Sequence, residues 1–140
     1  VVKIHPRDCG LGRWFRRIPA MARSRGVSER VHVVRGGDLR TLIDGSRGVV
    51  LVNSTVGLHA LRAGIPVCAT GAATYDLPGL AHQRGLDSFW TEPDPVDAAF
   101  FDTFERALTR IQVKGSFFDP AGRAAAIDEL AQRFAQPVEA

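Results

Sequence analysis

The sequence is poor in the residues that mark several classes of protein, and it has no long apolar run. Its 140 residues include one Met, one Tyr and two Cys. Cys9 and Cys68 lie far apart, with neither CxxC nor metal-ligand spacing, which favours two free thiols over a disulfide. No apolar run approaches the roughly 20 residues that a membrane-crossing helix requires. The composition, 45% apolar and 24% charged, is that of an ordinary globular domain.

Two familiar nucleotide-binding motifs are also missing. Gly10 and Gly12 begin a pattern like that of dinucleotide-binding loops, but Phe15 stands where the third small residue is required. No P-loop lysine motif occurs, and no acidic pair has the spacing of metal ligands. The sequence therefore argues against dinucleotide binding and ATP hydrolysis, and nothing in it requires a metal.

The charges are distributed unevenly along the chain. Residues 1–50 carry 11 Lys and Arg against 4 Asp and Glu, whereas residues 51–140 carry 7 against 11. A basic first half fits an anionic partner such as a phosphate, an anionic lipid surface or nucleic acid, but it fits a solvated arginine-rich helix face equally well. Aromatic residues beside the basic ones are limited to Trp14 and Phe15, which argues against nucleic acid.

The apolar pattern predicts short strands that alternate with helices. The strands are expected at 1–5, 31–34, 49–52 and 66–70, and the helices at 13–25 (bent or started near Pro19), 38–43 (capped by Asp38), 56–63, 97–111 and 121–135. Strands that are apolar on both faces and separated by helices are typical of a parallel sheet covered on both sides. We therefore predict one α/β, Rossmann-like domain over residues 1–140, with the last two helices packed on its sheet.

Ligands of such sheets bind at the carboxyl ends of the strands, where residues 5–8, 53–57 and 71–76 are expected. A helix that begins near Val56 would leave its first N–H groups unpaired at its positive end. Ser54 and Thr55 add hydroxyl groups, and Gly57 would let a ligand approach the backbone. This combination predicts a phosphate-binding turn. The alternative is that Ser54 or Thr55 only caps the helix.

The histidines differ in their expected roles. His5 ends the first strand, where Pro6 would fix the turn that aims it at a phosphate or ribose. His32 and His82 are interpreted as structural. His59 lies one helical turn after Thr55 and could face the same ligand, but a partly buried helix position is the simpler interpretation.

Four stretches together resemble a known family. "KIHPRD", "VNSTVGLHALRAGIPV", "TGAATYDLPGLAHQ" and "LDSFW", in this order between residues 3 and 90, resemble the bacterial capsule polysaccharide biosynthesis proteins, β-Kdo transferases that build the lipid-attached linker of capsular polysaccharides. The resemblance implies a two-domain GT-B glycosyltransferase whose C-terminal Rossmann-like domain holds the nucleotide-sugar. It also implies CMP-Kdo as a substrate, with no cofactor.

The resemblance assigns roles residue by residue. His5 and Pro6 would lie at the nucleotide and Ser54 and Thr55 at its phosphate, with Gly57 allowing the close approach. The remaining implied positions, beside the donor or the domain cleft, are Asn53, Gly71, Tyr75 and Asp76.

The sequence departs from the family pattern in two respects. His59 stands where the family often has an acidic residue. The acidic catalytic residue of the N-terminal domain has no counterpart, and neither Asp8 nor Asp76 is assigned that role. The chain opens without Met inside a predicted strand, so we expect a piece of a longer protein that binds nucleotide weakly and turns nothing over alone.

The resemblance further implies a cytoplasmic protein, peripheral at the inner membrane, with a lipid-linked acceptor as its second substrate. The basic first half fits both a CMP-sugar and an anionic membrane surface. Two alternatives remain open. One is a glycosyltransferase or epimerase that uses a UDP-sugar, since a phosphate-binding turn does not distinguish bases. The other is a non-catalytic interaction module of the same fold.

Overall fold

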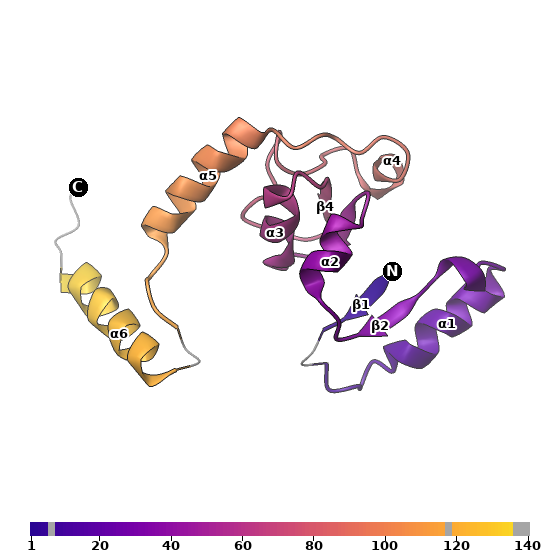
Figure 1. Cartoon of the computed structure of the whole chain (residues 1–140), viewed down its shortest axis with the longest axis horizontal. Coiled ribbons are helices and arrows are strands. Elements are labelled where there is room, and N and C mark those ends of the chain that lie inside the picture. Colours follow the sequence, from indigo (N-terminus) through magenta and orange to yellow (C-terminus); the bar gives the residue numbers. More distant parts are fainter. Residues whose placement is uncertain (6–7, 117–118, 136–140) are drawn as a thin grey trace. The chain divides into compact units, whose positions relative to one another are not determined.

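The structure is a computed structural model that describes residues 1–5, 8–116 and 119–135. The chain divides into two compact units, Val1–Arg47 and Gly48–Ala140. Figure 1 shows their helices and strands along the sequence. We describe each unit separately.

The first unit contains a pair of parallel strands and two α-helices. Its elements, in order, are β1 (Val2–Ile4), α1 (Trp14–Ser24), the short 3₁₀ helix η1 (Ser28–Arg30), β2 (Val33–Arg35) and α2 (Leu39–Asp44). Val2 pairs with Val33 and Ile4 with Arg35 in the β1–β2 ladder. Helix α1 lies beside β2 (Figure 1).

Two local predictions concern the helix starts of this unit. Asp38 caps α2 as expected, since its carboxylate accepts hydrogen bonds from the backbone N–H groups of Arg40 at 3.3 Å and Thr41 at 2.9 Å. Helix α1 begins at Trp14, after Arg13 in the left-handed conformation with φ 48°, and contains Pro19 within its span. The helix predicted over 13–25 is therefore confirmed, and of the two alternatives given for Pro19, a start near this residue is excluded because the preceding turn is already helical.

The second unit holds another parallel pair and the remaining helices. Its elements are β3 (Val49–Leu51), α3 (Val56–Arg62), β4 (Val67–Ala69), α4 (Leu86–Phe89), α5 (Ala98–Ile111) and α6 (Pro120–Ala135). Val49 pairs with Val67 and Leu51 with Ala69. Among the residues that the structure describes, the largest fully buried side chains lie in this unit, and they are Leu61, Val67, Tyr75 and Leu80.

These elements confirm an α/β chain with small parallel sheets flanked by helices. The expected single sheet is replaced, in the described residues, by two sheets of two strands, β1–β2 and β3–β4. Each strand has three residues, fewer than the apolar runs predicted. The two strands of each pair are therefore hydrogen-bonded over only a short length. This architecture is compatible with a Rossmann-like fold.

The last two helices form where predicted but pack differently from each other. Asp97 caps α5 by accepting a hydrogen bond from Phe100 N–H at 3.0 Å, and α5 packs on α3. Ile127 and Phe134 of α6 are 64% and 86% exposed. The expectation that α6 buries its apolar side chains on a sheet is therefore wrong for these residues. In the described ranges, no helix is long and apolar enough to cross a membrane.

Candidate functional site

The segments that follow β3 and β4 meet at one edge of the β3–β4 sheet. The N–H groups of Thr70 and Gly71 donate to the carbonyls of Leu51 at 2.8 Å and Val52 at 3.0 Å. A β-carbon on Gly71 would lie 2.7 Å from Cγ1 of Val52, so the two segments are in direct contact. Residues 53–57 and 71–76, predicted to share this edge, are brought together there.

The polar residues after β3 are accessible to solvent. Asn53, Ser54 and Thr55 are all exposed. Thr55 occupies the N-cap position of α3, yet its side chain makes no capping hydrogen bond. Ser54 Oγ accepts a hydrogen bond of 3.3 Å from Val56 N–H. Ser54 thus performs part of the capping role that was the alternative to ligand binding, whereas Thr55 does not.

The first N–H groups of α3 are paired, contrary to the sequence-based expectation. Val56 N–H donates to Ser54 Oγ, Gly57 N–H to the Ser54 carbonyl at 3.0 Å and Leu58 N–H to the Thr55 carbonyl at 3.0 Å. The expectation failed because a tight turn precedes the helix, and its carbonyls accept the donors that an abrupt helix start would leave open. The donors that this turn can offer to an anion are therefore chiefly the Ser54 and Thr55 hydroxyls.

Gly57 is required by packing inside the protein. The residue is buried, and a β-carbon on it would lie 2.4 Å from Cζ and 2.5 Å from the hydroxyl oxygen of Tyr75. The space that was expected to admit a ligand is filled by this aromatic ring. The absence of a side chain at Gly57 therefore lets the ring approach the helix backbone.

Tyr75 and Asp76 are neighbours with opposite environments. Tyr75 is 2% exposed, and its hydroxyl donates to the Ser54 carbonyl at 2.5 Å. Burial, and secondarily the charge of Asp76, raises the pKa of Tyr75 above its usual value. Asp76 is exposed and accepts a hydrogen bond of 3.0 Å from Gln83 Nε2. Of this pair, only Asp76 presents its polar group to solvent.

The remaining predictions concern three residues: His5, Pro6 and His59. His5 is an exposed residue of the first unit whose carbonyl accepts a hydrogen bond of 3.0 Å from Asp8 N–H. Pro6 lies outside the described residues. His59 is exposed rather than partly buried, because it lies on the face of α3 away from the core residues Ala60 and Leu61.

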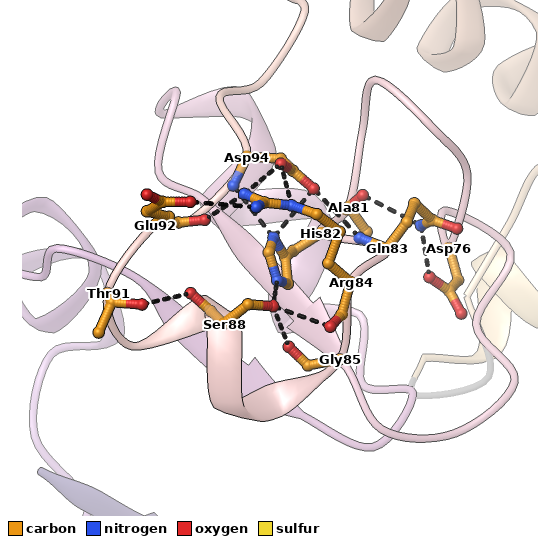
Figure 2. Close-up of polar contacts among 10 residues, drawn as sticks. All are labelled: Asp76, Ala81, His82, Gln83, Arg84, Gly85, Ser88, Thr91, Glu92 and Asp94. Atoms are coloured by element: carbon orange, nitrogen blue, oxygen red, sulfur yellow. Dashed lines mark hydrogen bonds and ion pairs between the residues drawn. The ribbon is translucent and has the colours of Figure 1, made fainter.

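A polar network centred on His82 was not recognised in the sequence beyond a structural role for this histidine. His82 is 3% exposed and lies between Asp94 and Ser88 (Figure 2). Its Nε2 is 2.8 Å from Ser88 Oγ, and its Nδ1 is 3.1 Å from the Asp94 backbone nitrogen and 2.9 Å from Asp94 Oδ2. Arg84 joins the network through bonds to Asp94 Oδ1. No sequence signal marks this network, because its members are brought together by the loop between β4 and α5.

Ser88, His82 and Asp94 of this network hold the loop between β4 and α5 in place. Nε2 of His82 bonds to Ser88 Oγ, and Nδ1 lies against both the backbone N–H and the carboxylate of Asp94. The Ser88 hydroxyl in turn lies within bonding distance of the Arg84 and Gly85 carbonyls, at 2.8 Å and 3.1 Å. A hydroxyl that donates to a backbone carbonyl is not activated as a nucleophile. The network therefore stabilises the loop, and the structural interpretation of His82 is confirmed.

A small groove of about 100 Å³ lies at the contact between α3 and α5 of the second unit. It is lined by Leu58, Phe101, Phe104 and Leu108, among others. Beside it, Arg62 forms an ion pair with Glu105.

In the part of the chain that the structure describes, no three His, Cys, Asp or Glu side chains gather as metal ligands would. Cys9 is exposed, Cys68 is buried, and both are free thiols, as predicted.

Comparison with known proteins relates most of the chain to capsule proteins. It is 32% identical over 120 residues to the capsule polysaccharide modification protein LipB of Neisseria meningitidis serogroup A, covering 84% of this chain and 29% of LipB. It is 31% identical over 119 residues to the capsule polysaccharide export protein KpsS of Escherichia coli, covering 84% of this chain and 31% of KpsS. Protein FixF of Sinorhizobium fredii is 32% identical over 130 residues, covering 86% of this chain and 29% of FixF.

The chain thus spans less than a third of the length of these relatives. No solved structure matches it significantly. The capsule polysaccharide biosynthesis protein family matches residues 1–118, a range that contains both strand pairs and the segments that meet after β3 and β4. The chain belongs to the capsule polysaccharide biosynthesis protein family.

Proposed function

We propose that this chain is the donor-binding part of a capsule glycosyltransferase that transfers Kdo from CMP-Kdo to a lipid-linked acceptor. Its family and the names of its relatives concern capsule polysaccharide biosynthesis, modification and export. One structural observation carries the proposal: Asn53, Ser54 and Thr55 are exposed on a turn at the carboxyl end of β3. In an open parallel sheet this is where ligands bind.

The chemistry of the site would be electrostatic. As the acceptor hydroxyl attacks the anomeric carbon, CMP departs and negative charge develops on its phosphate. Hydroxyl donors at Ser54 and Thr55 would stabilise that charge, as preorganised donors do where charge accumulates in a transition state. His5 and Pro6 are proposed to contact the nucleotide, as the resemblance implies. The catalytic acid or base is not assigned to any residue of this chain.

The donor proposal is tested by titrating the isotope-labelled chain with CMP and, separately, with UMP while NMR shifts are recorded. We expect saturable shifts for CMP at residues 53–57. The affinity for CMP should fall at least five-fold in Ser54→Ala. Thr103→Ala is the matched control, because it removes an exposed hydroxyl from α5, far along the chain from the turn. A preference for UMP would favour the UDP-sugar alternative. Absence of shifts with both nucleotides would favour a non-catalytic interaction module.

A second part of the proposal concerns an anionic membrane surface, where a lipid-linked acceptor would be found. Helix α1 carries Arg16 and Arg17 near its start and contains no acidic residue. Trp14 and Phe15 are 41% and 40% exposed, and the Arg17 guanidinium lies 5.0 Å from the centre of the Trp14 ring. Arginine attracts anionic lipid headgroups, and exposed aromatic residues favour the membrane interface.

Vesicle sedimentation tests the membrane proposal. The chain is expected to sediment with vesicles that contain phosphatidylglycerol, to remain in solution with pure phosphatidylcholine, and to dissociate as salt rises. Charge reversal at Arg16 and Arg17 should abolish sedimentation. Reversal at Arg106 and Arg110, which are exposed on α5, is the control of equal charge. Equal losses in both double variants would show that net charge, rather than α1, determines binding.

A further inference from the structure

We propose that Tyr75 is a positioning residue that orients the Ser54–Thr55 turn toward an anionic ligand without touching the ligand itself. Its ring is buried against Gly57, and its hydroxyl donates to the Ser54 carbonyl. The resemblance placed Tyr75 beside the donor, but a side chain that is 2% exposed and directed at the backbone has no surface to offer a ligand. This inference rests on the proposed donor-binding function.

The bond to Tyr75 helps to hold the orientation of one peptide group. The Ser54 carbonyl accepts two hydrogen bonds, from Tyr75 Oη at 2.5 Å and from Gly57 N–H at 3.0 Å. In a planar trans peptide the C=O and N–H groups point in opposite directions, and the described chain contains no cis peptide bond. Because the Ser54 carbonyl faces Tyr75, the Thr55 N–H is directed to the other side of the turn. Together with Gly57 N–H, the Tyr75 hydroxyl thereby holds the Thr55 N–H in position on that side of the turn.

Separate contacts hold the ring of Tyr75 and the segment that carries it. A β-carbon on Gly57 would overlap the ring, so the ring lies against the first turn of α3. The next residue, Asp76, is bonded to Gln83, whose N–H donates to Asp94 Oδ2 at 3.3 Å. Figure 2 shows these bonds connecting the segment after β4 with the His82 network. The loop that carries Tyr75 is thus braced independently of any ligand.

The inference predicts a specific effect on phosphate recognition. Tyr75→Phe keeps the ring that packs on Gly57 and removes only the hydroxyl that orients the Ser54 carbonyl. If the hydroxyl positions the phosphate donors, the variant loses affinity for CMP but keeps its affinity for cytidine, which lacks the phosphate. A merely structural role would reduce both affinities by the same factor. The ratio of the two affinities therefore separates positioning from general destabilisation.

The experiment is an NMR titration of the 140-residue chain and its Tyr75→Phe variant with CMP and with cytidine. The expected result is a CMP-to-cytidine affinity ratio reduced at least five-fold, together with a changed amide shift at Thr55. Thr109→Val is the matched control, because it also removes one hydroxyl-to-carbonyl bond, the 2.8 Å bond from Thr109 Oγ1 to the Glu105 carbonyl. An unchanged ratio in Tyr75→Phe would overturn the inference while leaving the donor site intact.

Two further outcomes are distinguishable. If the wild-type chain shows no preference for CMP over cytidine, the proposed function fails, and the positioning role fails with it. If Tyr75→Phe does not fold, labelling with 3-fluorotyrosine replaces the test, because Tyr75 is the single tyrosine of the chain. Fluorine changes the donor strength of the hydroxyl and keeps the ring, so the ratio should change at least two-fold. An unchanged ratio in the labelled chain would also overturn the inference.

Discussion

The ring of Tyr75 occupies the space in which a side chain at position 57 would lie. A β-carbon on Gly57 would be 2.4 Å from Cζ of that ring, well inside van der Waals contact. The two residues belong to segments that follow different strands of the β3–β4 sheet. Their contact therefore holds the two strand ends together beside the candidate donor turn.

Gly57→Ala should lower the free energy of unfolding. Alanine favours a helix over glycine by roughly 1 kcal/mol. The 2.4 Å approach to a buried ring should cost about 2–3 kcal/mol, the upper part of the range for overpacked cores, so we expect a net loss of about 1–2 kcal/mol. Urea denaturation measures this loss. Gly45→Ala is the control, because Gly45 is exposed after α2 with φ −87°, and its β-carbon would lie 3.3 Å from the nearest atom, the Thr41 carbonyl oxygen. A Gly57→Ala chain as stable as wild type would contradict the close packing.

His82→Leu should destabilise the loop between β4 and α5. Leucine fills a similar volume but leaves Asp94 N–H and the Ser88 hydroxyl without their bonds to the ring. Polar groups that lose a partner cost about 1–3 kcal/mol when buried, and because Ser88 and Asp94 are half-buried we expect a loss near the lower end of that range. Ser88→Ala should cost less, about 0.5–1.5 kcal/mol, because it removes one hydroxyl and the ring keeps its bond to Asp94 N–H. Thermal unfolding with both variants measures the difference, and equal losses would argue against a central role for His82.

Asp94 should make stability dependent on acid pH. Partial burial by itself raises the pKa of Asp94. Hydrogen bonds from Gln83 N–H and the Arg84 guanidinium, together with the charges of Arg84 and His82, have the opposite and larger effect, so the pKa lies below its usual value. A carboxyl group of lowered pKa adds stability above its unfolded pKa of about 3.9, and this is lost as pH falls through the folded value. The stability advantage of wild type over Asp94→Asn should therefore be present at pH 6 and shrink below pH 4. A constant difference across this range would show that the charge of Asp94 is not involved.

Tyr75 provides an optical signal of its own burial. As the chain contains one tyrosine, absorbance at the phenolate band near 295 nm reports this residue alone. Because the pKa of Tyr75 is raised in the folded chain, its phenol ionises at lower pH when the chain is unfolded. The stability due to neutral Tyr75 is therefore complete below a pH of about 10 and is lost as pH rises through the folded pKa. The folded chain should titrate at higher pH than the chain in urea. Coincident titrations would contradict the burial of the hydroxyl.

The two thiols should react at very different rates. Cys9 is exposed, whereas Cys68 is 3% exposed, and burial, followed by the charge of Asp76, raises the pKa of Cys68. Because the thiolate is the reactive form, Ellman's reagent at pH 8 should modify one thiol rapidly and the second only when the chain unfolds. A Cys9→Ser chain should show the slow reaction alone. Rapid modification of that variant would mean that β4 opens readily.

Much of the local structure was predictable because its causes lie within a few residues. Asp38 and Asp97 precede helical runs, and each side chain accepts a backbone N–H as an N-cap should. Apolar runs predicted the positions of the four strands because β-branched residues favour extended chains, although they did not predict that the strands form two separate pairs. The positions of α3 and α5 follow from helical periodicity in the same way. The short helix α4 was missed, since four residues provide too little periodicity.

The candidate site was only partly predictable. Its exposed hydroxyls at Ser54 and Thr55 follow directly from residue type and from the end of an apolar strand. The paired N–H groups of α3 did not follow, because turn carbonyls that accept them depend on the local path of the backbone. The exposure of His59 was also missed, because the orientation of a short helix is decided by what it packs against.

The amino-acid order was sufficient to establish the family, the alternation of strands and helices, and the polar turn after β3, since each depends on motifs or neighbouring residues. The partners of Tyr75 and His82 required the fold. Tyr75 meets Ser54 across 21 positions, and His82 meets Asp94 across 12. Contacts over such separations form only when the chain path closes the intervening loop, and the burial that makes them strong exists only inside the packed protein.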